Sequence, residues 1–466
     1  MLDRHAGASR FAYNQCLRLV VDALAAKRAE APVKVPWSGF DLINAFNAWK
    51  RSEAAGRVFV AAPDGTITKH VTGLRWRQEV SAQVFEEAAV DLGRALSAYS
   101  DNSSETLRVR VGFPRWKRKG RCRDSFRLRN RHGRGRGCSI RVGEGRPRSV
   151  TLPTIGVVRV HDDTRRLRRL LRPVAQLDPG TGQPRMAPRA KILFATVSRH
   201  GARWYVSLNV QAPDLHANRR HLPRPAGDEH GFVGLDRGLI AFAVAATADG
   251  TEVGRFKAPM PLQRGMVGLR RLSHRISASQ PRSRNRVRAV RRLSRQHARI
   301  ADVRRHFLHE VSRQLVQTHD RLCLEDLAVG NLITNRRLTR SIGDVAWAEF
   351  ARQLTYKAAW FGTELIICDR WFASTKICSV CGNVARQMGL AERTFCCADC
   401  GLVIDRDRNA AVNLAAWAER SHARAPDRQA GGRVINAPGG EGAGHRLGDG
   451  AASPSEGGTN AHAVVA

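Results

Sequence analysis

Four cysteines near the C-terminal end limit what this part of the chain can fold into. Cys378, Cys381, Cys397 and Cys400 follow the pattern C-x2-C-x15-C-x2-C. Two such pairs offer four thiolates from two tight turns, and together these can close a tetrahedron around a zinc ion. The spacing therefore predicts a zinc site whose main role is to stabilise the fold, with contact to nucleic acid as a second role.

The other six cysteines are scattered, and we interpret them as ordinary core or surface thiols. They are Cys16, Cys122, Cys138, Cys323, Cys368 and Cys396. The N-terminal residues lack an apolar signal region, and no apolar run approaches the ~20 residues that span a bilayer. We expect a cytoplasmic protein without a membrane partner, because a reducing compartment keeps thiolates available for zinc.

The charge of the chain indicates the class of its partner. The formal net charge is +37, and arginine supplies 68 of the 78 basic residues. The planar fork of arginine donates two parallel hydrogen bonds to a phosphate, which suits a polyanion. A GC-rich genome would also favour arginine codons, but codon bias does not by itself create so large a net charge. Nucleic acid is therefore the expected partner.

The texture of the sequence changes along the chain and predicts a multidomain α+β protein. Apolar residues recur at helical spacing within 9–28 and 74–99, so the first 105 residues are expected to be mostly helical. Short alternating runs bounded by Gly and Pro then predict a β-rich segment, with a barrel as one arrangement. Beyond Gly231, short apolar strands accompany two long basic helices that are broken near Gln280–Pro281.

Three carboxylates share one context in this last region. Asp236 and Glu325 each end a short apolar strand, and Asp407 opens a helix after the cysteines. Three converging carboxylates would repel one another unless divalent cations neutralised them. Hard oxygen ligands favour Mg²⁺ over zinc, and two Mg²⁺ ions ~3.5–4 Å apart can act on a phosphodiester. A strand-end Asp is more often a cap or turn residue, so spacing alone leaves both interpretations open.

The sequence around these residues resembles the TnpB family of transposon-encoded RNA-guided nucleases and the compact type V CRISPR effectors derived from it. The nuclease-core motifs are GLDRG at 234–238, CLEDL at 323–327 and DRDRNAA at 405–411. The zinc-finger motifs are STKICSVCG at 374–382 and FCCADCG at 395–401. Further matches are FPRWK at 113–117, LPTIG at 152–156, WYVSL at 204–208, Arg304 and FLH at 307–309.

The resemblance implies roles for individual residues. Asp236, Glu325 and Asp407 would be the catalytic ligands of two Mg²⁺ ions in one RuvC site. Asp405 would be a supporting residue or a helix cap. The family motif also selects Cys397 over Cys396 as a ligand of the structural Zn²⁺.

The resemblance also implies a domain order. It consists of a helical recognition (REC-like) domain at 1–105, a β-barrel wedge (WED) domain at 106–226, an RNase H-like α/β RuvC nuclease domain at 227–373 and 403–420, an inserted zinc-ribbon domain at 374–402, and a disordered tail at 421–466. Relatives usually begin with an additional β-strand, whereas here the first helix is expected almost at Met1.

The implied function is RNA-guided DNA cleavage. The protein would bind a structured guide RNA and cut complementary double-stranded DNA beside a short flanking motif, with the displaced single strand reaching the same site. It would act as a monomer, nucleoid-associated when bound to DNA. The alternative is a guided DNA-binding repressor, and transposon and CRISPR contexts are not separable from these residues. The basic helices at 264–305 would either line a nucleic-acid channel or form a solvated face. Three tryptophans, Trp116, Trp204 and Trp371, would either stack on bases or pack in a core.

Overall fold

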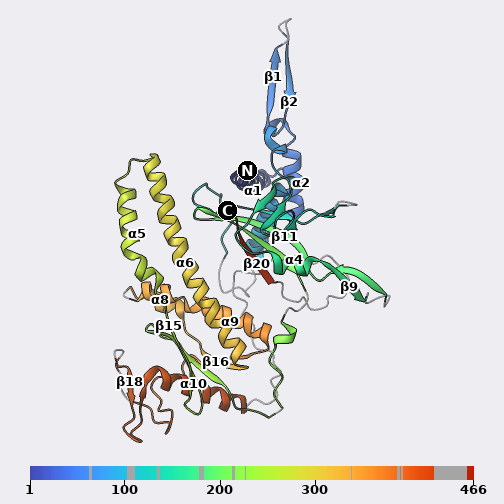
Figure 1. Cartoon of the computed structure of the whole chain (residues 1–466). Coiled ribbons are helices and arrows are strands. Elements are labelled where there is room, and N and C mark those ends of the chain that lie inside the picture. Colours follow the sequence, from blue (N-terminus) through green and yellow to red (C-terminus); the bar gives the residue numbers. More distant parts are fainter. Residues whose placement is uncertain are drawn as a thin grey trace. The chain divides into compact units, whose positions relative to one another are not determined.

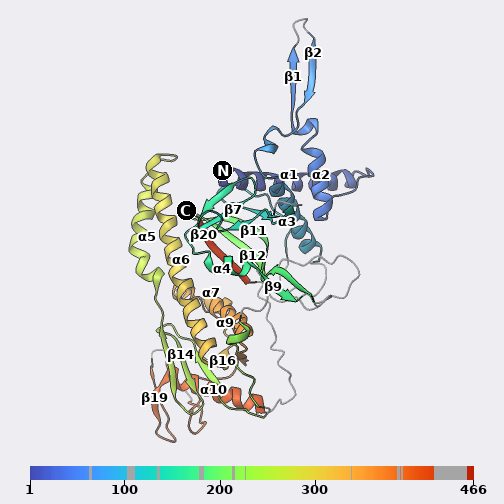
Figure 2. The same cartoon turned by 45° about the vertical axis from the view of Figure 1, so that its right-hand side comes forward.

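The computed structural model of the chain divides into two compact units, which comprise 1–213 with 452–466, and 214–451. Figures 1 and 2 show their elements from two directions. The described residues are 1–61, 66–101, 111–133, 137–177, 183–212, 216–225, 227–336, 338–385, 389, 392–423 and 459–465.

Three helices open the first unit. They are α1 (Leu2–Arg28), α2 (Gly39–Trp49) and α3 (Ala82–Ser100). Ser38 begins α2 in a capping box with Asp41, which satisfies backbone N–H groups at both positions. The helix expected from residue 74 begins only at Ala82, because Arg75–Gln78 forms a 3₁₀ turn before it.

A β-hairpin interrupts the predicted helical region. Strands β1 (Arg57–Ala61) and β2 (Ile67–Val71) pair antiparallel and extend away from α2 in both views (Figures 1 and 2). Nearly every residue of the two strands is exposed. The expectation of a mostly helical segment is therefore wrong for these residues.

The rest of the first unit is rich in strands, as predicted. A four-stranded sheet has the order β20-β12-β11-β3, with β3 (Ser125–Arg129), β11 (Lys191–His200), β12 (Arg203–Gln211) and β20 (Thr459–Val465). A three-stranded sheet joins β6 (Arg141–Val142), β7 (Ser149–Leu152) and β8 (Gly156–Arg159). Shorter elements are β4 (His132–Gly133), β5 (Gly137–Cys138), α4 (Arg165–Leu171), β9 (Pro173–Leu177) and β10 (Pro184–Pro188). Closure of these strands into a barrel stays a prediction.

The helices and strands of this unit share one hydrophobic core. Leu17 of α1 and Leu92 of α3 belong to the same buried cluster as Leu128 and Val206 of the sheet. The expected boundary at residue 105 falls outside the described residues. A separate core for 1–105 is therefore not what the structure has, because the helices complete their burial against the sheet.

The predicted disorder of 421–466 is wrong at both ends of that segment. Helix α10 (Arg406–Ala423) continues past residue 420, and β20 pairs antiparallel with β12. An edge strand has unpaired backbone groups, and the alternating residues of the C-terminal segment can pair with them. Residues 424–458 lie outside the described residues.

The second unit is built on a five-stranded sheet with the order β15-β14-β13-β16-β17. Its strands are β13 (Val233–Asp236), β14 (Ala241–Thr247), β15 (Glu252–Lys257), β16 (Arg321–Glu325) and β17 (Glu364–Cys368). β13, β16 and β17 are parallel, and the first three strands form an antiparallel meander. Both expected carboxylate-ended strands are confirmed.

Helices cover both faces of this sheet. On one face, Val233 and Leu235 pack with α6 (Arg284–Thr318) and α9 (Trp347–Phe361), while α10 lies against the other face. The two basic helices, α5 (Pro261–Ser277) and α6, are broken around Gln280, as predicted. The remaining helices are α7 (Val329–Thr334) and α8 (Thr339–Val345). No described helix is long and apolar enough to cross a membrane.

Candidate active site

Two of the predicted carboxylates lie side by side at the carboxyl ends of neighbouring strands. Asp236 ends β13 and Glu325 ends β16, and the residues before them, Leu235 and Leu324, are partners in a parallel ladder. Side chains alternate along a strand, so Asp236 shares the α10 face with Gly234. On β16, Cys323 packs against α10, and Glu325 shares its face.

The third carboxylate comes from the first turn of α10. A Cβ at Gly234 would lie 2.0 Å from the Ala411 carbonyl oxygen, so only glycine lets α10 cross β13 this closely. Asp407 is buried in this first turn. A Cβ at Gly238, in the turn after Asp236, would lie 3.7 Å from Asp407 Oδ2. The close crossing therefore brings Asp407 to the end of the sheet where Asp236 and Glu325 lie.

Electrostatics agree with this convergence. Burial, followed by the charges of Glu325 and Asp407, raises the pKa of Asp236 well above its usual value. Burial also raises the pKa of Glu325. No described group donates a hydrogen bond to the Asp236 carboxylate. Hard divalent cations would supply the charge that this set of oxygen donors lacks.

The carboxylates are spread more widely than the thiolates. Among the described residues, only the four cysteines form a group whose ligand atoms all lie within 4.8 Å of one another. Mg–O bonds are about 2.0–2.1 Å, so one ion cannot contact all three carboxylates in this geometry. A pair of ions ~3.5–4 Å apart takes a wider ligand set than a single ion does.

Two side chains that the sequence did not indicate contact Glu325. Ser374 Oγ donates a 2.7 Å hydrogen bond to Glu325 Oε1 and fixes the orientation of the carboxylate. Arg237 Nη2 donates to the Glu325 carbonyl oxygen, and burial lowers the pKa of this guanidinium to about 10. The available signal was position alone, since Arg237 directly follows Asp236 and Ser374 opens the predicted zinc segment.

The predicted grouping of the four cysteines is confirmed. Their sulfur atoms lie close enough together to hold one metal ion. Cys378 and Cys400 have their sulfurs 3.6 Å apart, and those of Cys381 and Cys397 are 3.5 Å apart. A tetrahedral ion with Zn–S bonds of about 2.3 Å needs sulfurs slightly less than 4 Å apart, so the four thiols fit zinc. Cys396 lies outside the group, as the family motif implied.

We call the segment 374–402 that carries the four cysteines the cysteine knuckle. Two buried asparagines of α10 join it to the carboxylate site. Asn409 Oδ1 accepts a 3.0 Å hydrogen bond from the Ser379 backbone N–H, and Asn409 Nδ2 donates to the Ile377 carbonyl at 2.7 Å. Asn413 Nδ2 donates to the carbonyl oxygens of Ser374 and Ile377 at 2.8 and 2.6 Å. The helix that carries Asp407 is thus tied to the cysteine knuckle, a role for these asparagines that sequence analysis missed.

Asp405 caps α10. The Arg408 backbone N–H donates a 2.9 Å hydrogen bond to Asp405 Oδ1, and Arg255 pairs with the same oxygen at 3.0 Å. This geometry confirms the expected helix cap. Asp405 caps the start of the helix. Asp407 is the second residue of the helix and is buried against the sheet.

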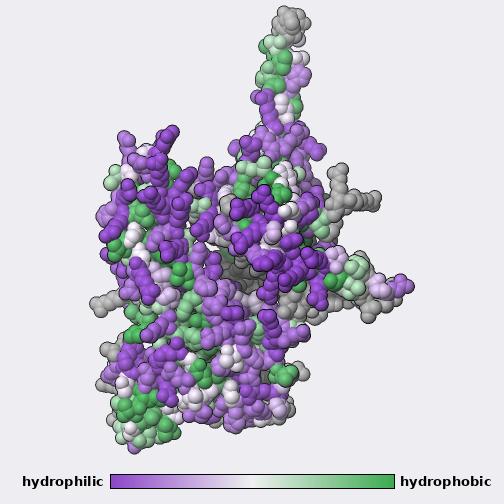
Figure 3. Space-filling view, in the orientation of Figure 1, coloured by the Kyte–Doolittle hydropathy of each residue, from purple (hydrophilic) through white to green (hydrophobic). Residues whose placement is uncertain are grey.

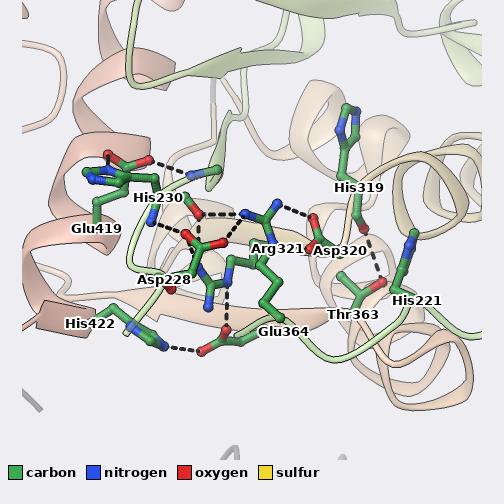
Figure 4. Close-up of polar contacts among 12 residues, drawn as sticks. His221, Asp228, His230, His319, Asp320, Arg321, Thr363, Glu364, Glu419 and His422 are labelled. Carbon is green, nitrogen blue, oxygen red and sulfur yellow. Dashed lines mark hydrogen bonds and ion pairs between the residues drawn. The ribbon is translucent and has the colours of Figure 1, made fainter. Parts of the chain in front are cut away.

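A different set of charges closes the opposite end of the sheet (Figure 4). Arg321, the first residue of β16, lies 3.2 Å from Glu364, the first residue of β17. His422 of α10 reaches Glu364 at 3.3 Å, and the Gly231 N–H donates to Glu419 at 2.9 Å. These contacts hold the C-terminal half of α10, so that the helix is fixed at both ends.

Known proteins match the sequence over most of this chain. Family models described as "Probable transposase" and "Cas12f1-like, TNB domain" match residues 210–336 and 347–414, which contain the three carboxylates and the four cysteines. A Mycobacterium tuberculosis protein named "Putative RNA-guided DNA endonuclease" is 32% identical over 428 residues, 90% of this chain and 83% of that protein. The chain belongs to the TnpB family.

Other TnpB-family matches agree. An Escherichia coli protein of the same description, InsQ, is 26% identical over 363 residues, 75% of this chain and 77% of its own. A TnpB-like mimivirus protein is 31% identical over 130 residues, 27% of this chain and 24% of its own. A solved Cas12f1–sgRNA–target DNA complex aligns with 13% identity and a TM-score of 0.48 over 89% of this chain and 81% of that chain, a likeness too weak to support an argument about the fold.

Proposed function

We propose that this protein is an RNA-guided DNA endonuclease with a single two-metal RuvC site. The observation that carries the proposal is the meeting of Asp236, Glu325 and Asp407 at one end of the sheet. Burial and mutual repulsion make this arrangement costly without cations, and such perturbed carboxylate groups are typical of functional sites. The description of the relatives as RNA-guided DNA endonucleases supports the same activity.

The three carboxylates would hold the ions. Two bound Mg²⁺ ions would activate the attacking water and stabilise the leaving oxygen of a phosphodiester. Ser374 keeps the Glu325 carboxylate in one orientation, and Arg237 places a buried positive charge beside it. The cysteine knuckle, held by Asn409 and Asn413, fixes the position of Asp407 through α10.

Nucleic acid would reach this site along basic surfaces. Helix α5 carries four arginines and α6 carries ten, against only Asp302 and Glu310 as acidic residues. Hydrophilic side chains predominate on this helical hairpin in Figure 3, with exposed valines such as Val287 and Val290 between them. In the proposed mechanism, guide pairing selects the DNA sequence and the protein recognises heteroduplex shape and a flanking motif. The assignments of 1–105 to recognition, 106–226 to a wedge and 374–402 to target binding belong to this proposal.

The test begins with the RNA that copurifies with the protein. Sequencing it identifies the guide, and the reconstituted complex is then given a plasmid that carries the complementary target and a randomised flank. We expect Mg²⁺-dependent cutting of matched plasmids. Asp236→Ala should abolish cutting and keep guided binding, whereas the control Glu349→Gln, which removes a partly exposed carboxylate of α9, should cut normally.

Two outcomes contradict the proposal. Cutting retained by Asp236→Ala would show that this carboxylate is not a catalytic ligand. Guided binding by the wild-type protein without cutting, across Mg²⁺ and Mn²⁺, would favour the guided repressor instead. Gel-shift and linearisation assays on the same complexes distinguish these results.

A further inference from the structure

Trp371 is an exposed aromatic side chain next to the candidate active site. Its exposed fraction is 87%, a value that only Leu222 equals among the large hydrophobic side chains of the described residues. Tryptophan normally buries most of its indole, because the ring carries a large apolar surface. A bare indole at the rim of a polar site therefore indicates a surface that a ligand covers.

The loop that carries Trp371 is fixed rather than loose. The Trp371 backbone N–H donates a 2.8 Å hydrogen bond to Asp369 Oδ1, which shapes a tight turn after β17. The next side chain, Phe372, turns inward and packs against Trp417 of α10, with ring centroids 6.1 Å apart. The indole is thus presented to solvent by a backbone held from both sides.

The same loop is tied to the catalytic strand end. Arg370 Nη2 contacts Asp326 Oδ2 at 2.6 Å, and Ser374 Oγ donates to Glu325 Oε1 at 2.7 Å. In addition, Glu325 is the ladder partner of Cys368, three residues before Trp371. Both flanks of the indole are therefore fixed to Glu325 or its neighbour, which places Trp371 at the edge of the carboxylate site.

We propose that Trp371 stacks on an unpaired base of the single-stranded DNA that the carboxylate site cuts, and so positions the adjacent phosphodiester. This inference rests on the proposed function. An aromatic face suits such a strand, because every base has a π-face and stacking does not depend on sequence, as guided cutting requires. Duplex bases are already stacked on each other, so the indole selects DNA that has been opened.

The chain offers a matched control. Leu222 is equally exposed. The backbone N–H of the preceding residue, His221, donates a hydrogen bond to the Phe361 carbonyl oxygen, and β17 begins three residues after Phe361. Leu222 therefore lies toward the opposite end of the sheet from Trp371. Leu222→Ala removes an exposed apolar side chain far from the carboxylates, and Trp371→Phe keeps a smaller aromatic face.

The binding experiment uses the full-length guide complex with Asp236→Ala, so that no strand is cut. Its probe is a 12-nucleotide single-stranded DNA with 2-aminopurine at one position, whose fluorescence falls when the base stacks. We expect Trp371→Ala to weaken binding about 5- to 150-fold and to remove the quenching. Trp371→Phe should keep most of both, and Leu222→Ala should change neither.

An abasic probe adds a second readout. Removing the stacked base should weaken the Trp371 protein and leave Trp371→Ala unchanged. The inference is overturned if Trp371→Ala binds as tightly as its parent, if Leu222→Ala loses as much, or if only an RNA probe responds. Because the cleavage-inactive background is used, these results stand apart from whether the wild-type complex cuts guided DNA.

In the cutting complex, Trp371→Ala should raise KM for a single-stranded substrate more than it lowers kcat, with the thermal midpoint unchanged. A fall in the midpoint would indicate a structural role for the indole and would contradict the proposal.

Discussion

The two ends of the five-stranded sheet use the same residue types for opposite purposes. At the amino ends of β16 and β17, every acidic group in the network of Figure 4 has a cationic or N–H partner, and hydrogen bonds from Arg224 lower the pKa values of Asp228 and Asp320. At the carboxyl ends, burial raises the pKa values of Asp236 and Glu325. At this end Arg406 lies 3.4 Å from Asp407 and Ser374 donates to Glu325, but Asp236 has no hydrogen-bond partner among the described residues. We call the amino end compensated and the carboxyl end uncompensated for this reason. The compensated charges hold the fold together, whereas Asp236 keeps its capacity to bind a cation.

The sharpest way to break this comparison is to neutralise the uncompensated end. Asp236→Asn should abolish cleavage and yet raise the free energy of unfolding, without added Mg²⁺, by about 1 kcal/mol, because it removes repulsion among buried carboxylates. Urea titration with and without Mg²⁺ measures this, and stabilisation by Mg²⁺ should shrink in the variant. A destabilised variant in the absence of Mg²⁺ would show that Asp236 is a structural residue.

The cysteine knuckle supports only the carboxyl end, so its loss should affect one end of the sheet. We expect Cys378→Ser, or chelation of the metal, to lower cleavage at least about tenfold, since Ser374, Asn409 and Asn413 lose their fixed partners. Hydrogen exchange should accelerate in 374–385 and in the first turns of α10. It should not change around Glu419 and His422.

The neighbouring cysteine provides the control for that variant. Cys396→Ser should cleave and exchange like the wild type, because its sulfur lies outside the ligand group. Unchanged protease resistance of the knuckle after chelation would contradict a zinc site.

Substitutions at the compensated end should have the reverse effect. They should lower the free energy of unfolding and leave cleavage unchanged. Arg321 is buried, pairs with Glu364 and donates to the carbonyl oxygens of Asp228 and His230 at 2.6 and 2.8 Å. Arg321→Met should lower the free energy of unfolding by about 2 kcal/mol, less than for a fully buried pair because the carboxylates are partly exposed. Arg352→Met, which breaks an exposed pair with Glu349, should cost less than about 0.5 kcal/mol. Equal losses would mean that burial does not distinguish the two arginines.

The smallest expected effect is on the stability of the protein at low pH. The pKa of Asp320 is lower in the folded protein than its value near 3.8 in the unfolded chain. The ionised carboxylate therefore stabilises the folded state above pH 3.8, and this stabilisation is lost as the pH falls through the pKa of the folded state. Asp320→Asn should therefore flatten the fall in unfolding midpoint below about pH 4, with Asp302→Asn as the exposed control. A slope identical to that of the wild type would remove Asp320 from the compensated set.

Sequence patterns predicted what short-range chemistry determines. The strand from Glu364 to Cys368, the helix break near Gln280 and the four-cysteine group follow from local periodicity, proline and spacing. The positions of the carboxylates at strand ends left a cap or turn role open, and the resemblance to the family motifs selected them. Their proximity also needed the parallel pairing of β13 with β16. That pairing depends on contacts between residues nearly ninety positions apart.

The missed features depend on contacts that leave no local pattern. Ser374 looks like a turn residue until Glu325 is seen beside it, and Asn409 and Asn413 look like ordinary helix residues until the knuckle backbone meets them. The β1–β2 hairpin was missed because a helical pattern on both sides outweighed a short alternating run. The C-terminal strand was missed because it follows a long segment rich in Gly, Ala and polar residues, and because its partner, β12, is far away in the sequence.

The missing side chain at Gly234 has a consequence for engineering this protein. The closeness of α10 to β13 sets the distance between Asp407 and Asp236, so a methyl group at Gly234 would push the helix away from the strand and change the spacing of the proposed cation ligands. Cation preference can then be tuned from a position that never meets a cation, by adjusting the seat of the helix instead of its ligands.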